Sequence, residues 1–271
     1  MKNILLHMND DRGLSARMEA ALALARYLDA KMSCLHTATN PEVALDIYTG
    51  GMFAVPLATV RQSAEAEWKT FRDKWAEKLS KEDVVWSWDR SGDVPASGLA
   101  EASILTDVTV VSLISDSLSE QTSSGFVATV LTKAAGPVLA VPEALDRFDP
   151  SGPVMIAWNG SAESGKALRA SLPLLERAAS VRLLAIGRPQ SDRLSGSDAA
   201  NYLGDYGIKA EVVERPETGE IGTQILAAAR EYEASLLVMG GYGRSRLAET
   251  LLGGATRTIL RDAHLPVLFN H

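Results

Sequence analysis

The chain has 271 residues, of which 46% are hydrophobic and 23% charged, and its formal net charge is −7 at pH 7. This composition is typical of a globular protein with one large domain or two of ordinary size. The negative charge argues against nucleic acid and anionic membrane surfaces as partners, because both would repel the chain. The apolar runs are too short to cross a bilayer and the N-terminal run is too short for a signal peptide, so we expect a cytoplasmic protein.

Two apolar segments that each run into an asparagine turn are the first sign of an internal repeat. Residues 3–9 read NILLHMN and residues 153–159 read PVMIAWN, at an offset of 159 − 9 = 150 residues. Near the end of each half a proline opens an apolar segment, at Pro137 and at Pro266, with an offset of 266 − 137 = 129. The first half therefore carries 150 − 129 = 21 additional residues between these two landmarks.

The periodicity of apolar residues predicts strands and helices in the same order in both halves. In the first half we expect strands within 3–9, 31–36, 107–113 and 137–141 and helices at 14–28 and 59–79. In the second half we expect strands within 153–159, 181–186, 234–239 and 266–270, a helix at 164–178 and a last helix from 253 to about 261. Strands that alternate with helices pair in parallel, because a crossover helix returns the chain to the same edge. The sequence therefore predicts an α/β fold with two tandem, doubly wound parallel sheets.

The boundary between the halves lies at 146–153, where Asp, Pro, Ser and Gly cluster and no periodic face persists. We therefore expect an N-terminal domain over 1–147 and a C-terminal domain over 152–271. The additional residues of the first domain follow its second strand, through 41–60 and into the long helix at 59–79.

Three aromatic residues at helical spacing, Trp68, Phe71 and Trp75, line one face of that long helix. Such a stripe ordinarily packs on the sheet or on a neighbouring domain. The alternative is a face that binds a ligand or a partner, and the sequence leaves both open.

Four glycines in two short elements of the second half carry the strongest indication of chemistry. Gly240 and Gly243 follow the strand at 234–239, at the edge of an open α/β sheet where ligands bind. Gly253 and Gly254 open the next helix, and a helix N-terminus offers unpaired N–H groups and the positive end of a dipole to phosphate. Two glycine-rich elements could thus converge on one polyphosphate, because glycine has no Cβ to hold the backbone away.

Positive charge and a hydroxyl flank these glycines, since Arg244 and Arg246 lie between them and Thr256 follows in the first turn of the helix. A Gly-x-x-Gly turn by itself is more often a plain loop than a phosphate site. The complete spacing, however, closely resembles the nucleotide-binding motif of the universal stress protein family, and the turn at 157–161 resembles that family's first turn. The resemblance covers both halves, whereas the diagnostic motif is present only in the second.

This resemblance implies Rossmann-like domains of the adenine nucleotide alpha hydrolase type and a site for ATP, ADP or AMP, with Mg²⁺. Asn159 matches the residue near the adenosine, Ile186 the residue against the adenine ring, and the glycines those at the ribose and phosphates. None of these residues is expected to be catalytic or to bind a metal by itself. The candidate nucleotide-binding residues are Asn159, Ile186, Met239, Gly240, Gly243, Arg244, Gly253, Gly254, Ala255 and Thr256.

Two residues depart from the family pattern. The family usually has Asp at the position of Asn159 and Ser or Thr at the position of Gly254, so one charge and one hydroxyl are missing. Each lost charge-assisted hydrogen bond costs about 1.5–3 kcal/mol, or roughly 10- to 150-fold in affinity. Whether Thr256 compensates for the missing hydroxyl is left open.

The first half lacks the glycines. At the offset of 129, Gly240 and Gly243 correspond to Val111 and Ile114, whose side chains would occupy the place of phosphate, and a shift by one residue gives serines instead. We therefore expect a degenerate first site in a domain kept for its packing. The resemblance implies that the two domains pair through their fifth strands, and it also implies a homodimer.

Two functions from different classes follow. The first is a nucleotide-binding regulatory protein of the stress response with at most slow ATP hydrolysis. The second is an interaction or chaperone-like scaffold that uses the helix at 59–79. Hydrolase motifs are absent from the sequence, and the one cysteine, Cys34, excludes disulfide frameworks and cysteine-based metal clusters. A metal site formed by His7, His36 and a neighbouring Asp is a minor alternative.

Overall fold

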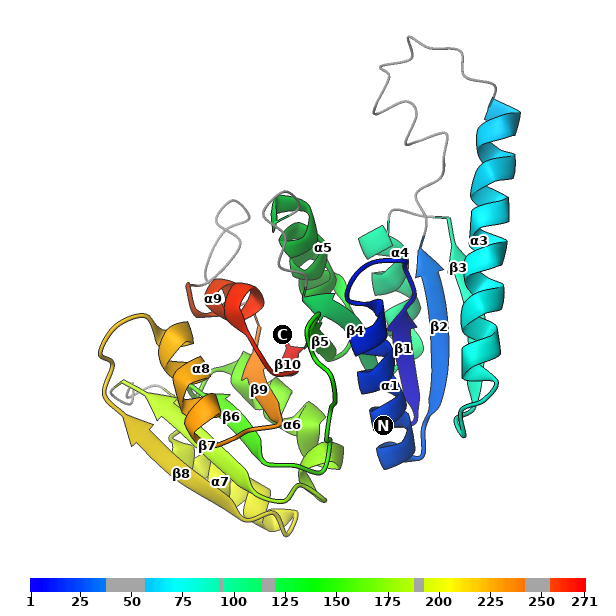
Figure 1. The fold of residues 1–271 in the computed structure, drawn as a ribbon. Helices are drawn as coiled ribbons and strands as arrows, with labels where there is room; N and C mark the ends of the chain where they lie inside the picture. Colours follow the sequence, from blue (N-terminus) through cyan, green and yellow to red (C-terminus); the bar gives the residue numbers. More distant parts are fainter. Residues whose placement is uncertain (38–56, 93–94, 114–119, 188–192, 242–253) are drawn as a thin grey trace.

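A computed structural model describes residues 1–37, 57–92, 95–113, 120–187, 193–241 and 254–271 of the chain. Ten strands form one sheet in the order β3-β2-β1-β4-β5-β10-β9-β6-β7-β8 (Figure 1). The strands of the first half are β1 (Asn3–His7), β2 (Lys31–Thr37), β3 (Trp86–Ser91), β4 (Val108–Leu113) and β5 (Val138–Pro142). Those of the second half are β6 (Val154–Trp158), β7 (Val181–Ile186), β8 (Ala210–Arg215), β9 (Leu236–Gly240) and β10 (Val267–Asn270).

Each half repeats one arrangement, because the order β3-β2-β1-β4-β5 is matched by β8-β7-β6-β9-β10. Within each half the strands pair in parallel. The halves join where β5 and β10 pair antiparallel, with Leu268 opposite Leu139. The predicted α/β class of doubly wound parallel sheets is confirmed, and the two fifth strands pair as the resemblance implied.

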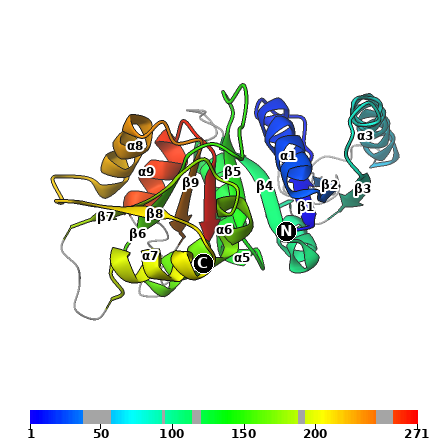
Figure 2. The same cartoon turned by 90° about the horizontal axis from the view of Figure 1, so that it is seen from below.

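Helices cover both faces of the sheet (Figure 2). The helices of the first half are α1 (Leu14–Leu28), α3 (Leu57–Leu79), α4 (Pro95–Ala102) and α5 (Glu120–Lys133), with a 3₁₀ turn η1 (Ser103–Leu105). Those of the second half are α6 (Ala162–Leu175), α7 (Gly196–Asp205), α8 (Ile221–Glu231) and α9 (Gly254–Asp262). None of the described helices is long and apolar enough to span a membrane.

Two apolar layers, one on each face, run through both halves. One layer packs α1, α3, α6 and α7 on the sheet, and the other packs α4, α5, α8 and α9. At the junction the side chains alternate between the layers, since Leu139 and Leu268 belong to the first and Ala140 and Val267 to the second. Parallel strands need both faces covered, which explains why every residue of β4 and β5 is buried.

The edge strands β3 and β8 are among the elements that the sequence pattern did not reveal. Both alternate between half-buried and exposed positions and carry charged residues, Asp89 and Arg90 in β3 and Glu211 and Glu214 in β8. An edge strand is covered less completely, so its apolar signal is weaker than that of a central strand. The helix expected at 164–178 ends earlier, at Leu175.

The long helix α3 is the counterpart of α7, because each follows the second strand of its half. It has 23 residues where α7 has 10, and it extends past the ends of the neighbouring strands (Figure 1). Its aromatic face packs on the sheet: the Phe71 ring lies edge-on to Trp88 with centroids 6.0 Å apart, and Trp75 is buried. The packing alternative for this face is thus confirmed, whereas residues 38–56 of the additional segment lie outside the described residues.

We expect the chain to unfold in a single cooperative transition, because both apolar layers continue across the β5–β10 pairing. In scanning calorimetry the ratio of calorimetric to van't Hoff enthalpy should be about 1. Leu268→Ala, at a fully buried position of the junction, should lower the free energy of unfolding by about 2–5 kcal/mol and move the whole transition. Two resolved transitions, of which only one moves in the variant, would contradict this coupling.

Candidate functional site

A pocket of about 210 Å³ opens at the carboxyl ends of β6 and β7. Its lining comes from the ends of β6, β7 and β8 and from the starts of α7 and α8. Two of the predicted residues, Asn159 and Ile186, lie in it together. Ile186, Leu194 and Ile221 contribute apolar surface, and Glu214 and Glu217 contribute carboxylates.

The turn after β6 shapes one side of this pocket. The indole Nε1 of Trp158 donates to the carbonyl of Leu194 at 3.1 Å, which fixes the chain that leads into α7. Gly160 has φ +70°, and a Cβ there would lie 2.4 Å from the same carbonyl, so this turn requires glycine. The side-chain oxygen of Asn159 accepts from the N–H of Ser161 at 3.1 Å, and Ser161 caps α6.

Gly240, at the end of β9, lies beside this turn because β9 pairs with β6. A Cβ on Gly240 would lie 2.6 Å from the backbone nitrogen of Ser164, in the first turn of α6. The contact shows a packing reason for this glycine, in addition to the close ligand approach that the sequence suggested. The preceding Met239 is buried.

The described part of the second glycine element begins with α9. Gly254 is exposed, and a Cβ built on it meets no atom within 4 Å in the part of the chain that the structure describes. Thr256 is buried, so it does not present a hydroxyl on the surface in place of the missing one. The remaining predicted residues, Gly243, Arg244 and Gly253, lie outside the described residues.

Helix α8 holds the first turn of α9 in place. Gly222 lies so close to α9 that a Cβ on it would be 2.8 Å from the carbonyl of Ala255. Glu220 caps α8 by accepting from the N–H groups of Gly222 at 3.2 Å and Thr223 at 2.7 Å. Burial raises the pKa of Glu220, but hydrogen bonds from Thr223, Thr258 and Gly222 outweigh this and lower the pKa. Because Thr258 belongs to α9, this carboxylate links the two helices.

The pocket residues that the sequence did not suggest come from the segments before α7 and after β8. Arg193 donates to the carbonyl of Asn159 at 3.3 Å, and Leu194 is 63% exposed at the rim. Glu214 and Glu217 follow from β8. Assigning β8 as a strand is the step that would have brought these carboxylates to the carboxyl edge of the sheet.

In the first half a buried arginine lies at the ends of β1 and β4. Arg17 is 0% exposed, and its guanidinium donates to the carboxylate of Asp11 at 2.6 and 2.8 Å. It also donates to the carbonyls of His7 at 2.6 Å and Asn9 at 2.7 Å and to the hydroxyl of Ser112 at 2.9 Å. At the offset of 150 the second half has an alanine, Ala167, in place of this arginine.

Strand pairing decides which residue replaces Gly240 in the first half. Leu6 lies opposite Val110 as Ile156 lies opposite Val238, so Ser112 and not Val111 corresponds to Gly240. The expectation that Val111 blocks phosphate is therefore wrong, because its side chain lies in the apolar layer of the other face. Ser112 instead contacts Gly13, where a Cβ would be 2.4 Å from the serine hydroxyl.

The histidines of the first half serve packing. His7 is buried, stacks on Phe126 at a centroid distance of 4.9 Å and hydrogen-bonds Thr37 at 2.9 Å. His36 hydrogen-bonds the carbonyl of Met8 at 2.7 Å. Among the described residues no three His, Cys, Asp or Glu side chains cluster to hold a metal ion. Burial, and next the charges of Arg17 and His36, lower the pKa of His7 well below 6.5.

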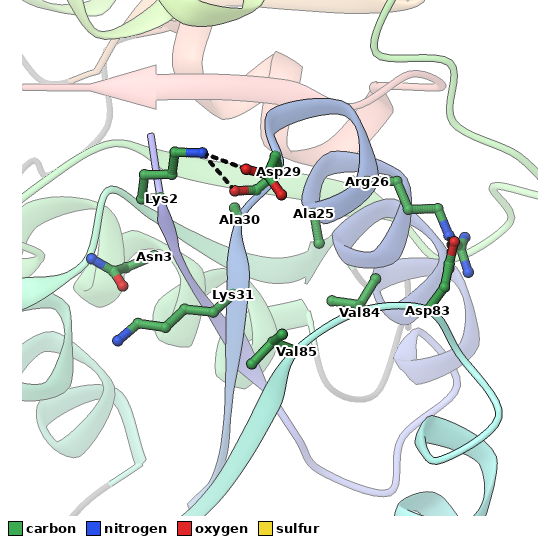
Figure 3. Close-up of a pocket in the computed structure, with 10 residues that line it drawn as sticks. All are labelled: Lys2, Asn3, Ala25, Arg26, Asp29, Ala30, Lys31, Asp83, Val84 and Val85. Atoms are coloured by element: carbon green, nitrogen blue, oxygen red, sulfur yellow. Dashed lines mark hydrogen bonds and ion pairs between the residues drawn. The ribbon is translucent and has the colours of Figure 1, made fainter.

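A second hollow, of about 560 Å³, lies in the first half, at the amino ends of its strands (Figure 3). Two of its cations are paired: Lys2 Nζ lies 2.8 Å from Asp29, and Arg26 Nε lies 2.7 Å from Asp83. Ligands of open α/β sheets bind at the carboxyl ends of strands, so this hollow is the weaker candidate.

Comparison with known proteins agrees with the fold described above. The model of the universal stress protein family matches residues 151–270. A universal stress protein from Archaeoglobus fulgidus superposes with a TM-score of 0.75 at 16% identity, covering 99% of this chain and 95% of that one.

Two proteins from Pseudomonas aeruginosa also match, each covering 99% of this chain and 92% of the other. One, of unknown function, gives a TM-score of 0.65 at 14% identity, and a candidate universal stress protein gives 0.63 at 15%. At these identities the solved structures show a shared fold. No curated protein matches the chain in sequence.

Replacing Arg17 tests the internal pairing of the first half. Arg17→Met should lower the free energy of unfolding by about 3 kcal/mol, because it leaves the Asp11 carboxylate without its cation and takes a donor from the buried carbonyl of His7. Lys2→Met is the matched control: it removes a cation from an ion pair whose side chains are 66% and 97% exposed, so stability should barely change. Equal effects of the two substitutions in urea denaturation would contradict the role assigned to Arg17.

The lowered pKa of His7 predicts how stability depends on pH. Below pH 6.5, His7 binds fewer protons in the folded state than in the unfolded state. Its contribution to the free energy of unfolding is therefore fully present above that pH and decreases as the pH falls. The loss from one such group is about 1.4 kcal/mol per pH unit. Urea titrations of wild type and His7→Gln between about pH 6.5 and 5.5 should show a shallower slope in the variant. An unchanged slope would mean that His7 becomes protonated in the folded protein.

Proposed function

Residues 151–270 form a universal stress protein family domain, and we propose that this domain binds an adenine nucleotide, ATP or a relative, as the sensor of a stress-response protein. The proposal assigns the site to the C-terminal domain, 152–271, and leaves the N-terminal domain, 1–147, without one. We propose at most slow ATP hydrolysis, a cytoplasmic location and, by family resemblance, a homodimer of tandem chains.

One observation carries this proposal: the pocket with Asn159 and Ile186 adjoins the strand end at Gly240. The strands β7, β6 and β9 are consecutive neighbours in the sheet, so a ligand that crosses their ends meets both the pocket and the glycine elements. A nucleoside suits the partly apolar pocket, and its phosphates would then extend toward α9.

Charge supports the same direction. Glu214 and Glu217 line the pocket and would repel phosphate, whereas the N-terminus of α9 attracts it. Arg244 and Arg246 precede that helix in the sequence and are positively charged. Mg²⁺ would accompany the phosphates as a ligand of ATP, since magnesium sites commonly combine one or two carboxylates with substrate phosphates.

The second candidate function is a scaffold that binds a protein through α3. The observation that favours it is the length of this helix, which extends past the strands although its counterpart α7 is short (Figure 1). It requires no nucleotide, so a failure to bind ATP would favour it.

Gly254 offers a direct test, because a Cβ there meets no atom of the described residues within 4 Å. Gly254→Asp should leave stability unchanged or slightly raised, since a carboxylate suits a helix N-terminus. The same carboxylate would repel phosphate, so titration calorimetry with ATP and Mg²⁺ should show one site per chain in wild type and at least about a 10-fold loss of affinity in this variant. Gly254→Ser restores the hydroxyl of the family and should bind more tightly than wild type.

Thermal unfolding of both variants controls for folding. Two sites per chain would contradict the assignment of one degenerate half. Absence of binding in wild type at millimolar ATP would refute the nucleotide site and favour the scaffold.

A further inference from the structure

The pocket at the ends of β7 and β8 contains a carboxylate in a position to select the base. Resting on the proposed nucleotide site, we propose that Glu217 reads the base by accepting a hydrogen bond from the 6-amino group of adenine. The residue would thereby select 6-amino purines over 6-oxo purines. Glu217 lies outside the glycine motif and outside the candidate residues that the sequence suggested.

The order of the strands determines which part of a nucleotide meets Glu217. In the sheet β9 is followed by β6, β7 and β8. With the phosphates at α9, beyond the end of β9, the ribose lies next to Asn159 at the end of β6. The base, which follows the ribose, then reaches the ends of β7 and β8, where Glu217 lines the pocket.

The surroundings of this place suit a flat heterocycle with one polar edge. Ile186, Leu194 and Ile221 supply apolar walls, and Leu194 is 63% exposed, so a bound ring would cover apolar surface that now faces water. Bases are commonly held by such apolar contacts with a few polar groups that fix their orientation.

Gly187 allows the Glu217 carboxylate to approach the backbone at the end of β7. It has φ +88°, which favours glycine, and a Cβ on it would lie 3.3 Å from Oε2 of Glu217. The N–H of Gly187 donates to the carbonyl of Arg215 at 2.9 Å, which ties the end of β7 to the end of β8. Glu217 therefore sits above the carboxyl edge, directly beside Ile186.

Glu214 differs from Glu217 in a way that makes it a matched control. Both carboxylates line the pocket, and neither has a hydrogen-bond or ion-pair partner among the described residues. Glu214 lies within β8, opposite Ala185, whereas Glu217 follows the end of the strand. The two substitutions to Gln remove the same charge from the same pocket, but only one removes the group beside the base.

The chemistry of a carboxylate explains the expected selectivity. An ionised carboxylate only accepts hydrogen bonds, so it pairs with the 6-amino group of adenine and repels the 6-oxo group of hypoxanthine. A site built to pair with a donor discriminates strongly against a ligand that lacks it. The amide of Gln both donates and accepts, so it can pair with either base.

The test compares ATP with ITP, which differ at position 6 and in the proton that hypoxanthine carries on N1, in wild type, Glu217→Gln and Glu214→Gln by titration calorimetry with Mg²⁺. Wild type should bind ATP at least about 10-fold more tightly than ITP. Glu217→Gln should bring the ratio of the two affinities close to parity, mainly by tighter binding of ITP. Glu214→Gln should change both affinities together and keep the wild-type ratio.

The outcomes separate this inference from the proposed function. If wild type binds ATP but Glu217→Gln keeps the wild-type ratio of ATP to ITP affinity, Glu217 does not read the base. The same conclusion follows if Glu217→Gln and Glu214→Gln change this ratio equally. If wild type binds neither nucleotide, the nucleotide site itself is refuted. Melting temperatures of the three proteins show whether each variant is folded, and a gain in ITP affinity cannot come from misfolding.

Discussion

The antiparallel pairing of β5 with β10 is the contact on which the rest of the molecule depends. It joins two sheets of five strands into one of ten. Neither β5 nor β10, the last strand of each half, is therefore an exposed edge. Because residues of both strands alternate between the two apolar layers, each layer is continuous from one half to the other. The remaining edges, β3 and β8, carry charged residues, a composition that discourages further pairing.

One close contact in each half shows how the two halves have diverged. In the second half the strand carries the glycine, Gly240, and the first turn of α6 packs against it. In the first half the helix side carries the glycine, Gly13, and the strand carries Ser112. The serine hydroxyl accepts from the buried Arg17, whereas the second half has Ala167 at the equivalent place. A buried guanidinium thus lies in the first half where the second half has a buried alanine.

Central elements of the fold could be predicted from the sequence, since buried parallel strands and the helices between them produce strong periodic patterns. The bounds of β1, α1 and β7 agree with the pattern, whereas the edge strands β3 and β8 were missed. That omission hid Glu217, because its place in the pocket depends on where β8 ends. The role of Arg17 was also hidden, since a charge within an apolar helix pattern does not reveal its partners.

The segment after the second strand is longer in the first half than in the second, since α3 has 23 residues and α7 has 10. In an open α/β sheet the segment after the second strand borders the ligand site, so its length is constrained where a ligand must enter. In the second half this segment leads into the short helix α7 and supplies Leu194 to the pocket. In the first half, for which we propose no nucleotide site, Arg17 is buried at the ends of β1 and β4. The long helix α3 lies in this half, with its aromatic face packed on β3.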